Sequence, residues 1–146
     1  MKPKWITEDY IEACKQIQDM IDIEDFMWYL NSENSPNTFS MIIPDDWRNR
    51  TIIPVAREMG ICILLPDLGW LVRKLDDHLA GINGGFTINN NTMWSIEVRY
   101  EAEYLNAFGD ITHGEDGFDE EGNTPEEACI KALIVLKEGG CLGDKT

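Results

Sequence analysis

Carboxylates are concentrated between residues 101 and 127, a stretch with ten acidic residues and no lysine or arginine. Glu126 and Glu127 are explained by the helix that starts beside them, because acidic side chains favour the first turn of a helix. The other candidates for binding a partner are Glu115, Asp116, Asp119, Glu120 and Glu121. Such a surface would attract a basic partner in a salt-sensitive manner. The alternative is a solvated loop with no binding role.

His113 stands next to these acids and could add a nitrogen ligand or a general base. Asp110, Glu115, Asp116 and Asp119 surround it in the sequence, which would suit a small oxygen-rich metal site and a metal-dependent hydrolase. The spacing fits no EF-hand loop, and the common hydrolase, phosphate-loop and dinucleotide motifs are missing from the sequence. We therefore expect a non-enzymatic protein with no catalytic residue, cofactor or bound metal, and we keep the hydrolase as an alternative.

A second candidate site is the segment "PDDWRNR". Trp47 falls outside any apolar stripe, so we expect an exposed ring that can stack on a ligand. Arg48 and Arg50 beside it could hold an anionic group. This arrangement would suit a protein that binds a nucleotide or another small anion.

The overall charge narrows the classes of partner. The chain has 27 acidic and 12 basic residues among 146, which gives a net charge of −15. That charge opposes direct binding to nucleic acid and to anionic membranes, and it favours a protein partner with a basic surface. The sequence has no apolar run of about 20 residues and no secretion signal at its start, so we expect a cytoplasmic location.

Four cysteines are widely spaced and match no zinc-ligand pattern. They are Cys14, Cys62, Cys129 and Cys141. We expect free thiols, with Cys14 and Cys129 acting as small apolar residues on helices.

Helical patterns dominate the first half of the chain. Apolar spacing predicts a helix that is capped by Thr7 and continues to Ile21. A short helical pattern over 23–30 either continues this helix or restarts after a bend, and a loop over 31–40 follows. A further helix precedes Gly60, with Pro54 in its first turn and its apolar residues on one side. A buried strand over 61–65 and a regular helix over 67–80 follow, and His78 near the end of that helix would favour its negative terminus.

Alternation of apolar and polar residues replaces the helical period after Gly84. Residues 86–88 and 94–104 read as strands separated by a turn, and the second has one apolar face. Its length would allow a bend near residues 100–102, and "YLNAFGDI" could add a strand before an acidic loop. Thr124, Pro125 and Glu127 then predict the start of a buried helix.

The C-terminal part resembles the small phage and prophage proteins called phage ABA-sandwich domains. The match is carried by Trp94, Val98, Thr124, Pro125, Glu126, Glu127, Ala128 and the Ala132-Leu133 pair. It covers residues 50–138 if "RTIIPVAREMG" corresponds to an earlier helix of the family, and 93–138 otherwise. The resemblance implies an α/β/α arrangement and a phage or prophage origin, and it brings no catalytic residues.

Together these patterns predict one α+β domain over residues 1–146. It has an N-terminal helical extension (1–44), a core (45–140) in which helices pack on a small antiparallel or mixed sheet in an α/β/α sandwich-like way, and a tail (141–146). The predicted function is that of an acidic phage accessory protein that acts by binding. One version is a counter-defence inhibitor that blocks a basic, nucleic-acid-binding host protein. The sequence leaves the oligomeric state and the strand order open.

Overall fold

A computed structural model describes residues 2–32 and 38–138, apart from the side chains of Arg48 and Asn49. The predicted tail and Cys141 lie outside these residues. The chain divides into two compact units, residues 1–67 and 68–146, and each is described by itself. Helices and two antiparallel three-stranded sheets confirm the predicted α+β class. A single domain over the whole chain stays a prediction.

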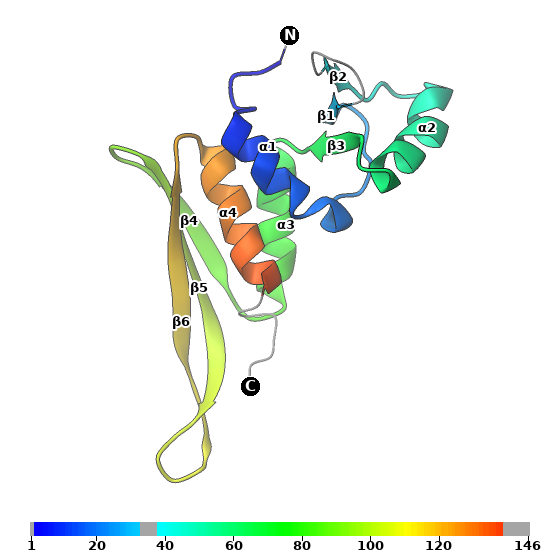
Figure 1. The fold of residues 1–146 in the computed structure, drawn as a ribbon. Helices are drawn as coiled ribbons and strands as arrows, with labels where there is room; N and C mark the ends of the chain where they lie inside the picture. Colours follow the sequence, from blue (N-terminus) through cyan, green and yellow to red (C-terminus); the bar gives the residue numbers. More distant parts are fainter. Residues whose placement is uncertain (1, 33–37, 139–146) are drawn as a thin grey trace. The chain divides into compact units, whose positions relative to one another are not determined.

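The first unit builds its sheet in the order β2-β1-β3, with both strand pairs antiparallel (Figure 1). Its elements are α1 (Glu8–Lys15), the 3₁₀ turn η1 (Gln18–Met20), β1 (Trp28–Asn31), β2 (Thr38–Met41), α2 (Trp47–Glu58) and β3 (Cys62–Leu65). All four residues of β3 are buried, as expected for the run "ICILL". β3 is therefore an edge strand, and it is buried because α1 and α2 pack against it.

Helix α1 begins where the sequence predicts. The Thr7 side chain accepts a hydrogen bond from the Tyr10 backbone N–H at 3.1 Å, which satisfies one of the free donors of the first turn. The Tyr10 ring is fully buried and its hydroxyl donates to the Pro66 carbonyl. The helix ends at Lys15 and does not continue to Ile21. The Gln18 amide explains this early end, because it donates to the Leu64 carbonyl at 2.9 Å and accepts from the Leu64 N–H at 2.9 Å.

The predicted helix over residues 23–30 is wrong, because this segment turns and enters β1. Phe26 has a backbone φ of 65°, which lies outside the right-handed helical region. Its N–H donates to the Ile42 carbonyl at 2.7 Å, and the Ile42 N–H donates to the Met27 carbonyl at 2.8 Å. These bonds lead into the β1–β2 pairing. The expected loop over 31–40 likewise gives way to β2 from Thr38, and residues 33–37 lie outside the described part.

Helix α2 forms as predicted but differs in two respects. Pro54 lies in the helix interior and not in the first turn. The expected apolar side is also exposed, since Ile52, Val55 and Met59 retain 50%, 57% and 68% of their accessible surface, while Ile53 is buried. The apolar pattern therefore predicted the helix correctly but does not identify its buried face.

The second unit packs two helices on one face of a sheet with the order β4-β5-β6 (Figure 1). Its elements are α3 (Leu68–Ala80), β4 (Gly85–Asn90), β5 (Trp94–Leu105), β6 (Ile111–Gly122) and α4 (Pro125–Glu138). Ile96 and Val98 of β5 are fully buried, as are Leu75 of α3 and Leu133 of α4. The core of this unit thus lies between the two helices and the near end of the β5–β6 hairpin.

The start of α4 confirms the predicted capping pattern. The Glu127 N–H donates to the Thr124 hydroxyl at 3.1 Å. The Glu127 carboxylate reaches back to the Asn123 N–H at 3.1 Å, one residue before the expected partner. A side chain at Gly122 would come within 2.6 Å of the Glu127 Cβ. The glycine therefore lets the helix start close against the end of β6.

The acidic segment is a strand, so the expected acidic loop is wrong. β6 pairs with β5 in an unbroken register from Trp94 opposite Gly122 to Leu105 opposite Ile111. The strand predicted over 94–104 is confirmed, and the unbroken register leaves no bulge near residues 100–102. The predicted additional strand is instead the turn of this hairpin. Among the described residues, no helix is both long and apolar enough to cross a membrane.

Candidate functional site

The face of the β4–β5–β6 sheet opposite the helices carries the acidic residues of the candidate site, and we call it the open face. The register pairs Glu97 with Asp119 and Glu101 with Glu115, and these four side chains are exposed. Because alternate strand residues share a face, the carboxylates of the open face come from both strands. They are Glu97, Glu101, Glu103, Glu115, Asp119 and Glu121.

The strand separates the five predicted partner-binding residues into two sets. Glu115, Asp119 and Glu121 lie on the open face. Asp116 and Glu120 lie on the other face, where Asp116 accepts a hydrogen bond from the Tyr100 hydroxyl at 3.4 Å and Glu120 stands opposite Ile96. The five carboxylates therefore do not form one patch.

Arg99 is the basic residue at the centre of the open face. Its guanidinium lies 2.5 Å from Glu97 and 3.5 Å from Asp119, so one cation serves two carboxylates. It also donates to the Val98 carbonyl at 2.8 Å. A side chain at Gly117 would come within 2.1 Å of that carbonyl oxygen and 2.7 Å of the guanidinium. Gly117 thus leaves the space that Arg99 fills.

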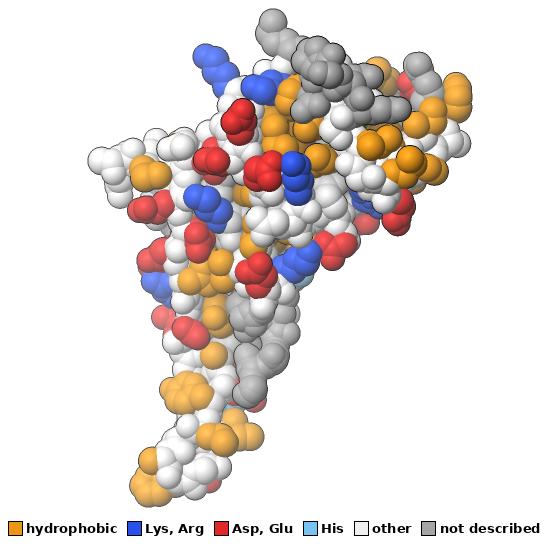
Figure 2. Space-filling model, in the orientation of Figure 1, with side chains coloured by type: hydrophobic (Ala, Val, Ile, Leu, Met, Phe, Trp, Pro, Cys, Tyr) orange, Lys and Arg blue, Asp and Glu red, His pale blue; other side chains and the backbone are white. Residues whose placement is uncertain are grey.

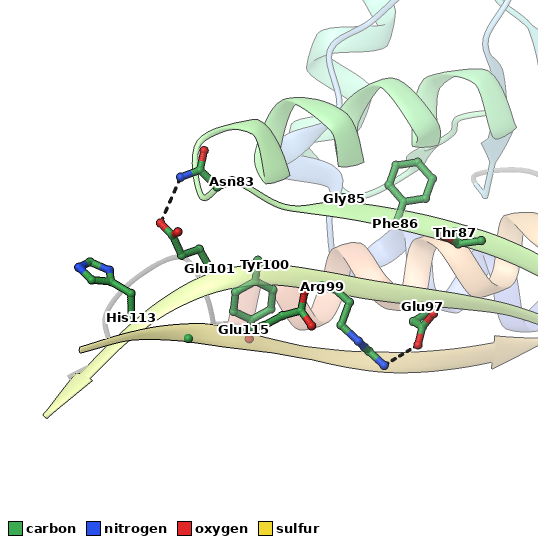
Figure 3. A pocket seen from close by; sticks show the side chains of 11 residues that line it. Asn83, Gly85, Phe86, Thr87, Glu97, Arg99, Tyr100, Glu101, His113 and Glu115 are labelled. Carbon is green, nitrogen blue, oxygen red and sulfur yellow. Dashed lines mark hydrogen bonds and ion pairs between the residues drawn. The ribbon is translucent and has the colours of Figure 1, made fainter. Parts of the chain in front are cut away.

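A shallow hollow of about 600 Å³ lies next to Arg99 (Figure 3). Asn83, just before β4, donates to the Glu101 carboxylate at 3.2 Å, and Figure 3 shows both this bond and the Arg99–Glu97 pair. The lining residues are Asn83, Gly85, Phe86, Thr87, Glu97, Arg99, Tyr100, Glu101, His113, Gly114 and Glu115. The hollow is therefore lined by three carboxylates, Glu97, Glu101 and Glu115, and is suited to a cationic side chain of a partner.

His113 lies on the open face, with its Nδ1 3.8 Å from the Glu103 carboxylate. Of its four predicted neighbours, Glu115 lines the same hollow, but the other three do not gather around it. Asp110 belongs to the hairpin turn, Asp116 points to the other face, and Asp119 is six residues along the same strand. Within residues 2–32 and 38–138, no group of three or more His, Cys, Asp or Glu side chains is arranged to hold a metal ion.

The segment proposed to bind an anion lies at the start of α2 in the first unit. Trp47 is exposed, with 66% of its surface accessible, as expected. Arg50 is also exposed and lies 3.5 Å from the Asp45 carboxylate, which offsets its charge. The side chain of Arg48 lies outside the described residues. Anion binding at this segment stays a prediction.

The three cysteines in the described part of the chain are buried free thiols, as expected. Burial raises the pKa of Cys62 to about 11 and that of Cys129 to about 12. Burial likewise raises the pKa of Cys14 far above its usual range. These groups stay protonated at neutral pH, so they serve packing and not nucleophilic chemistry.

Sequence reasoning missed the contribution of β5 to the open face. Glu101 and Glu103 belong to the acidic stretch 101–127 and Glu97 does not, but the sequence did not place these three residues opposite β6. Their alternation was visible in the sequence. The short turn between residues 105 and 111 could have shown that the acids of β5 and β6 lie side by side, because a short turn makes two adjacent strands antiparallel.

Comparisons of the chain with protein-family models, curated proteins and solved structures found no match.

Proposed function

We propose that the protein works by binding a partner with a basic surface through the open face of the β4–β5–β6 sheet. The observation that carries this proposal is the pairing of like charges across the hairpin. Glu101 lies directly opposite Glu115, and Glu97 lies directly opposite Asp119. Like charges in directly opposed positions destabilise a sheet, by an amount comparable to the roughly 0.2–1 kcal/mol of a favourable pair.

The arrangement has a simple electrostatic consequence. Arg99 partly neutralises the Glu97–Asp119 pair. The Glu101–Glu115 pair lies further along the hairpin, with Glu103 next to it on the same face. A docked basic surface would relieve this repulsion, so binding would gain free energy that the isolated fold lacks. The same field would speed association and make it sensitive to salt.

The biological setting is part of the same proposal. The resemblance to phage ABA-sandwich domains supports a phage or prophage accessory protein in the cytoplasm of a bacterial host. A basic, nucleic-acid-binding host protein is the kind of partner that an acidic face would block, in a counter-defence role. In this proposal the protein is non-enzymatic, and its effect comes from occupying the surface of its partner.

The test compares two variants that each remove three negative charges. The face variant carries Glu101→Gln, Glu115→Gln and Glu121→Gln. The control variant carries Glu12→Gln, Glu58→Gln and Asp76→Asn, at exposed positions on helices. Immobilised wild-type and variant proteins are incubated with bacterial lysate at about 50 mM and about 300 mM salt, where screening differs strongly.

We expect the wild type and the control variant to retain the same basic protein at low salt and to release it at high salt. The face variant should retain much less, because its local field is weakened. Equal retention by both variants would show that only total charge matters. That result, or the absence of any retained basic protein, would overturn the proposed function.

A further inference from the structure

The β5–β6 hairpin ends in a group of exposed apolar side chains, which we call the tip. Tyr104, Leu105, Phe108 and Ile111 retain 56%, 68%, 88% and 64% of their accessible surface. Figure 2 shows hydrophobic side chains gathered over this end of the hairpin. Scattered apolar residues are normal on a surface, but several exposed ones at one end of a hairpin are typical of an interaction site. Leu105 and Ile111 lie on one face of the hairpin and Tyr104 on the other.

Hydrogen bonds within the turn fix the backbone that carries Phe108. The Asn106 side-chain oxygen accepts hydrogen bonds from the Phe108 N–H at 2.8 Å and the Asp110 N–H at 3.1 Å. The Asn106 N–H donates to the Asp110 carbonyl at 2.9 Å, and Gly109 takes a left-handed φ of 82°. Phe108 therefore projects from an internally hydrogen-bonded turn. A preorganised group of this kind loses less conformational entropy when it binds.

The tip is continuous with the open face. Leu105 and Ile111 are directly paired, and they follow the Glu103–His113 pair on the same side of the hairpin. An exposed aromatic and aliphatic cluster beside charged residues has the composition of an interface, in which buried apolar anchors give affinity and surrounding charges give orientation.

We propose that the tip is the apolar anchor of this interface and inserts into an apolar cleft on the same basic protein that the open face binds. This inference rests on the proposed function, because the open face selects the partner. A second copy of the chain would place two acidic open faces close together, which like-charge repulsion opposes. An anionic lipid surface would be repelled by Glu101, Glu103 and Asp110 near the tip.

The first experiment measures affinity for the captured basic protein with matched phenylalanine variants. Phe108→Ser removes the centre of the tip, and Phe26→Ser removes a similarly exposed ring, 63% accessible, in the other unit. We expect Phe108→Ser to weaken binding more than about tenfold with an unchanged salt dependence, as for a central anchor residue. Phe26→Ser should bind like the wild type. Thermal unfolding of both variants checks that the fold is retained.

The second experiment replaces Phe108 or Phe26 with a photoreactive phenylalanine analogue and identifies the crosslinked product. A crosslink from position 108 to the basic protein, with none from position 26, supports the anchor. A crosslink from position 108 to a second copy or to lipid overturns it, and so does equal affinity of Phe108→Ser and wild type.

The two proposals fail in different ways. If Phe108→Ser binds the captured protein as tightly as wild type while the face variant does not, the anchor is wrong and the proposed function stands. If position 108 crosslinks a protein that the face variant also retains fully, the tip binds but the open face does not select the partner. If no protein is retained or crosslinked by any form, both proposals are overturned.

Discussion

The two ends of the β5–β6 hairpin contain apolar residues with opposite environments. At the near end, Ile96 and Val98 are fully buried, because α4 packs against this part of both strands. At the far end, Tyr104 lies on the same face of the strand as Ile96 and Val98 but retains 56% of its accessible surface. Strand geometry is the same at both ends. The difference lies in whether a helix covers the strand, so residues that stabilise the fold at one end are available for binding at the other.

The largest expected effect is on the free energy of unfolding, when isoleucine is replaced by alanine at each end of the hairpin. Ile96→Ala removes buried methyl groups and leaves a cavity, which should lower the free energy of unfolding by about 2–5 kcal/mol. Ile111→Ala removes an exposed side chain and should change it by less than about 0.5 kcal/mol. Chemical denaturation of both variants measures these values. Similar losses at the two positions would contradict the distinction.

A second comparison uses the two glycines that flank Arg99 on the neighbouring strands. Gly117→Ala would force a methyl group against the Val98 carbonyl and the Arg99 side chain. We expect a loss of about 1–3 kcal/mol, the usual range for overpacking. Gly85→Ala faces open space and should be close to neutral. If both variants unfold at the wild-type midpoint, Arg99 does not occupy the space above Gly117.

The acidic pairs of the open face predict a smaller effect of opposite sign. Glu115→Gln removes one charge from the directly opposed Glu101–Glu115 pair and should stabilise the fold by about 0.2–1 kcal/mol at low salt. Glu121→Gln, opposite the neutral Ser95, serves as the control and should change stability less. Unfolding at low and high salt should show the gain shrinking as salt increases. A stabilising effect that is equal in both variants would reflect net charge alone.

The smallest effect concerns the pH dependence of α3. Burial lowers the pKa of His78 from its ordinary value of 6.5, and the nearby Lys74 lowers it further. As the pH falls below about 6.5, the unfolded chain takes up this proton before the folded protein does, so the folded state loses stability. The loss between pH 7 and pH 5 should therefore be larger in wild type than in His78→Asn. Parallel pH profiles would show that His78 contributes nothing.

His78 lies in the last turn of α3, where the sequence predicted it. The sequence suggested that a protonated His78 would interact favourably with the negative end of the helix. In the structure the side chain is partly buried next to Lys74, and both effects favour the neutral form. Burial and Lys74 therefore favour the neutral form of His78, whereas Asp77 and the helix end favour the protonated form.

Elements with a strong local cause were predictable from the sequence. The start of α4 follows from Thr124 and Glu127, whose hydrogen bonds involve only adjacent residues. β3 follows from a short apolar run between Gly60 and Pro66, and α3 from its regular apolar spacing. The α+β class follows from these segments together.

Elements that depend on partners distant in the sequence were not predictable in the same way. Residues 23–30 looked helical because their apolar residues are three and four apart, but the Phe26 N–H donates to the Ile42 carbonyl just beyond the β1–β2 pairing. β6 looked like a loop because glycine and aspartate are unfavourable in strands. Its glycines are instead required by Arg99, which lies over Gly117, and by α4, which packs against Gly122. Residue propensities therefore predicted the wrong secondary structure in segments where contacts across the sheet determine it.

The candidate site likewise has features that the sequence predicts and features that depend on contacts distant in the sequence. The acidic run was recognised, but its separation into Glu115, Asp119 and Glu121 on one face and Asp116 and Glu120 on the other requires the strand register. The tip could not be recognised as exposed either, since Tyr104 continues the apolar alternation of Ile96 and Val98. The structure shows that the helices cover only the near part of β5, so the apolar residues beyond that part are exposed.

Hydrogen–deuterium exchange on the complex with the captured basic protein tests the central claim most directly. In the free protein, the amides of residues 106–110 are bonded only within an exposed turn, so local opening should let them exchange faster than the amides of the buried elements. We predict that the complex slows exchange at residues 103–115, which include the tip and the adjoining part of the open face, and leaves α2 unchanged. Unchanged exchange at the hairpin, with protection appearing elsewhere in the chain, would contradict the account.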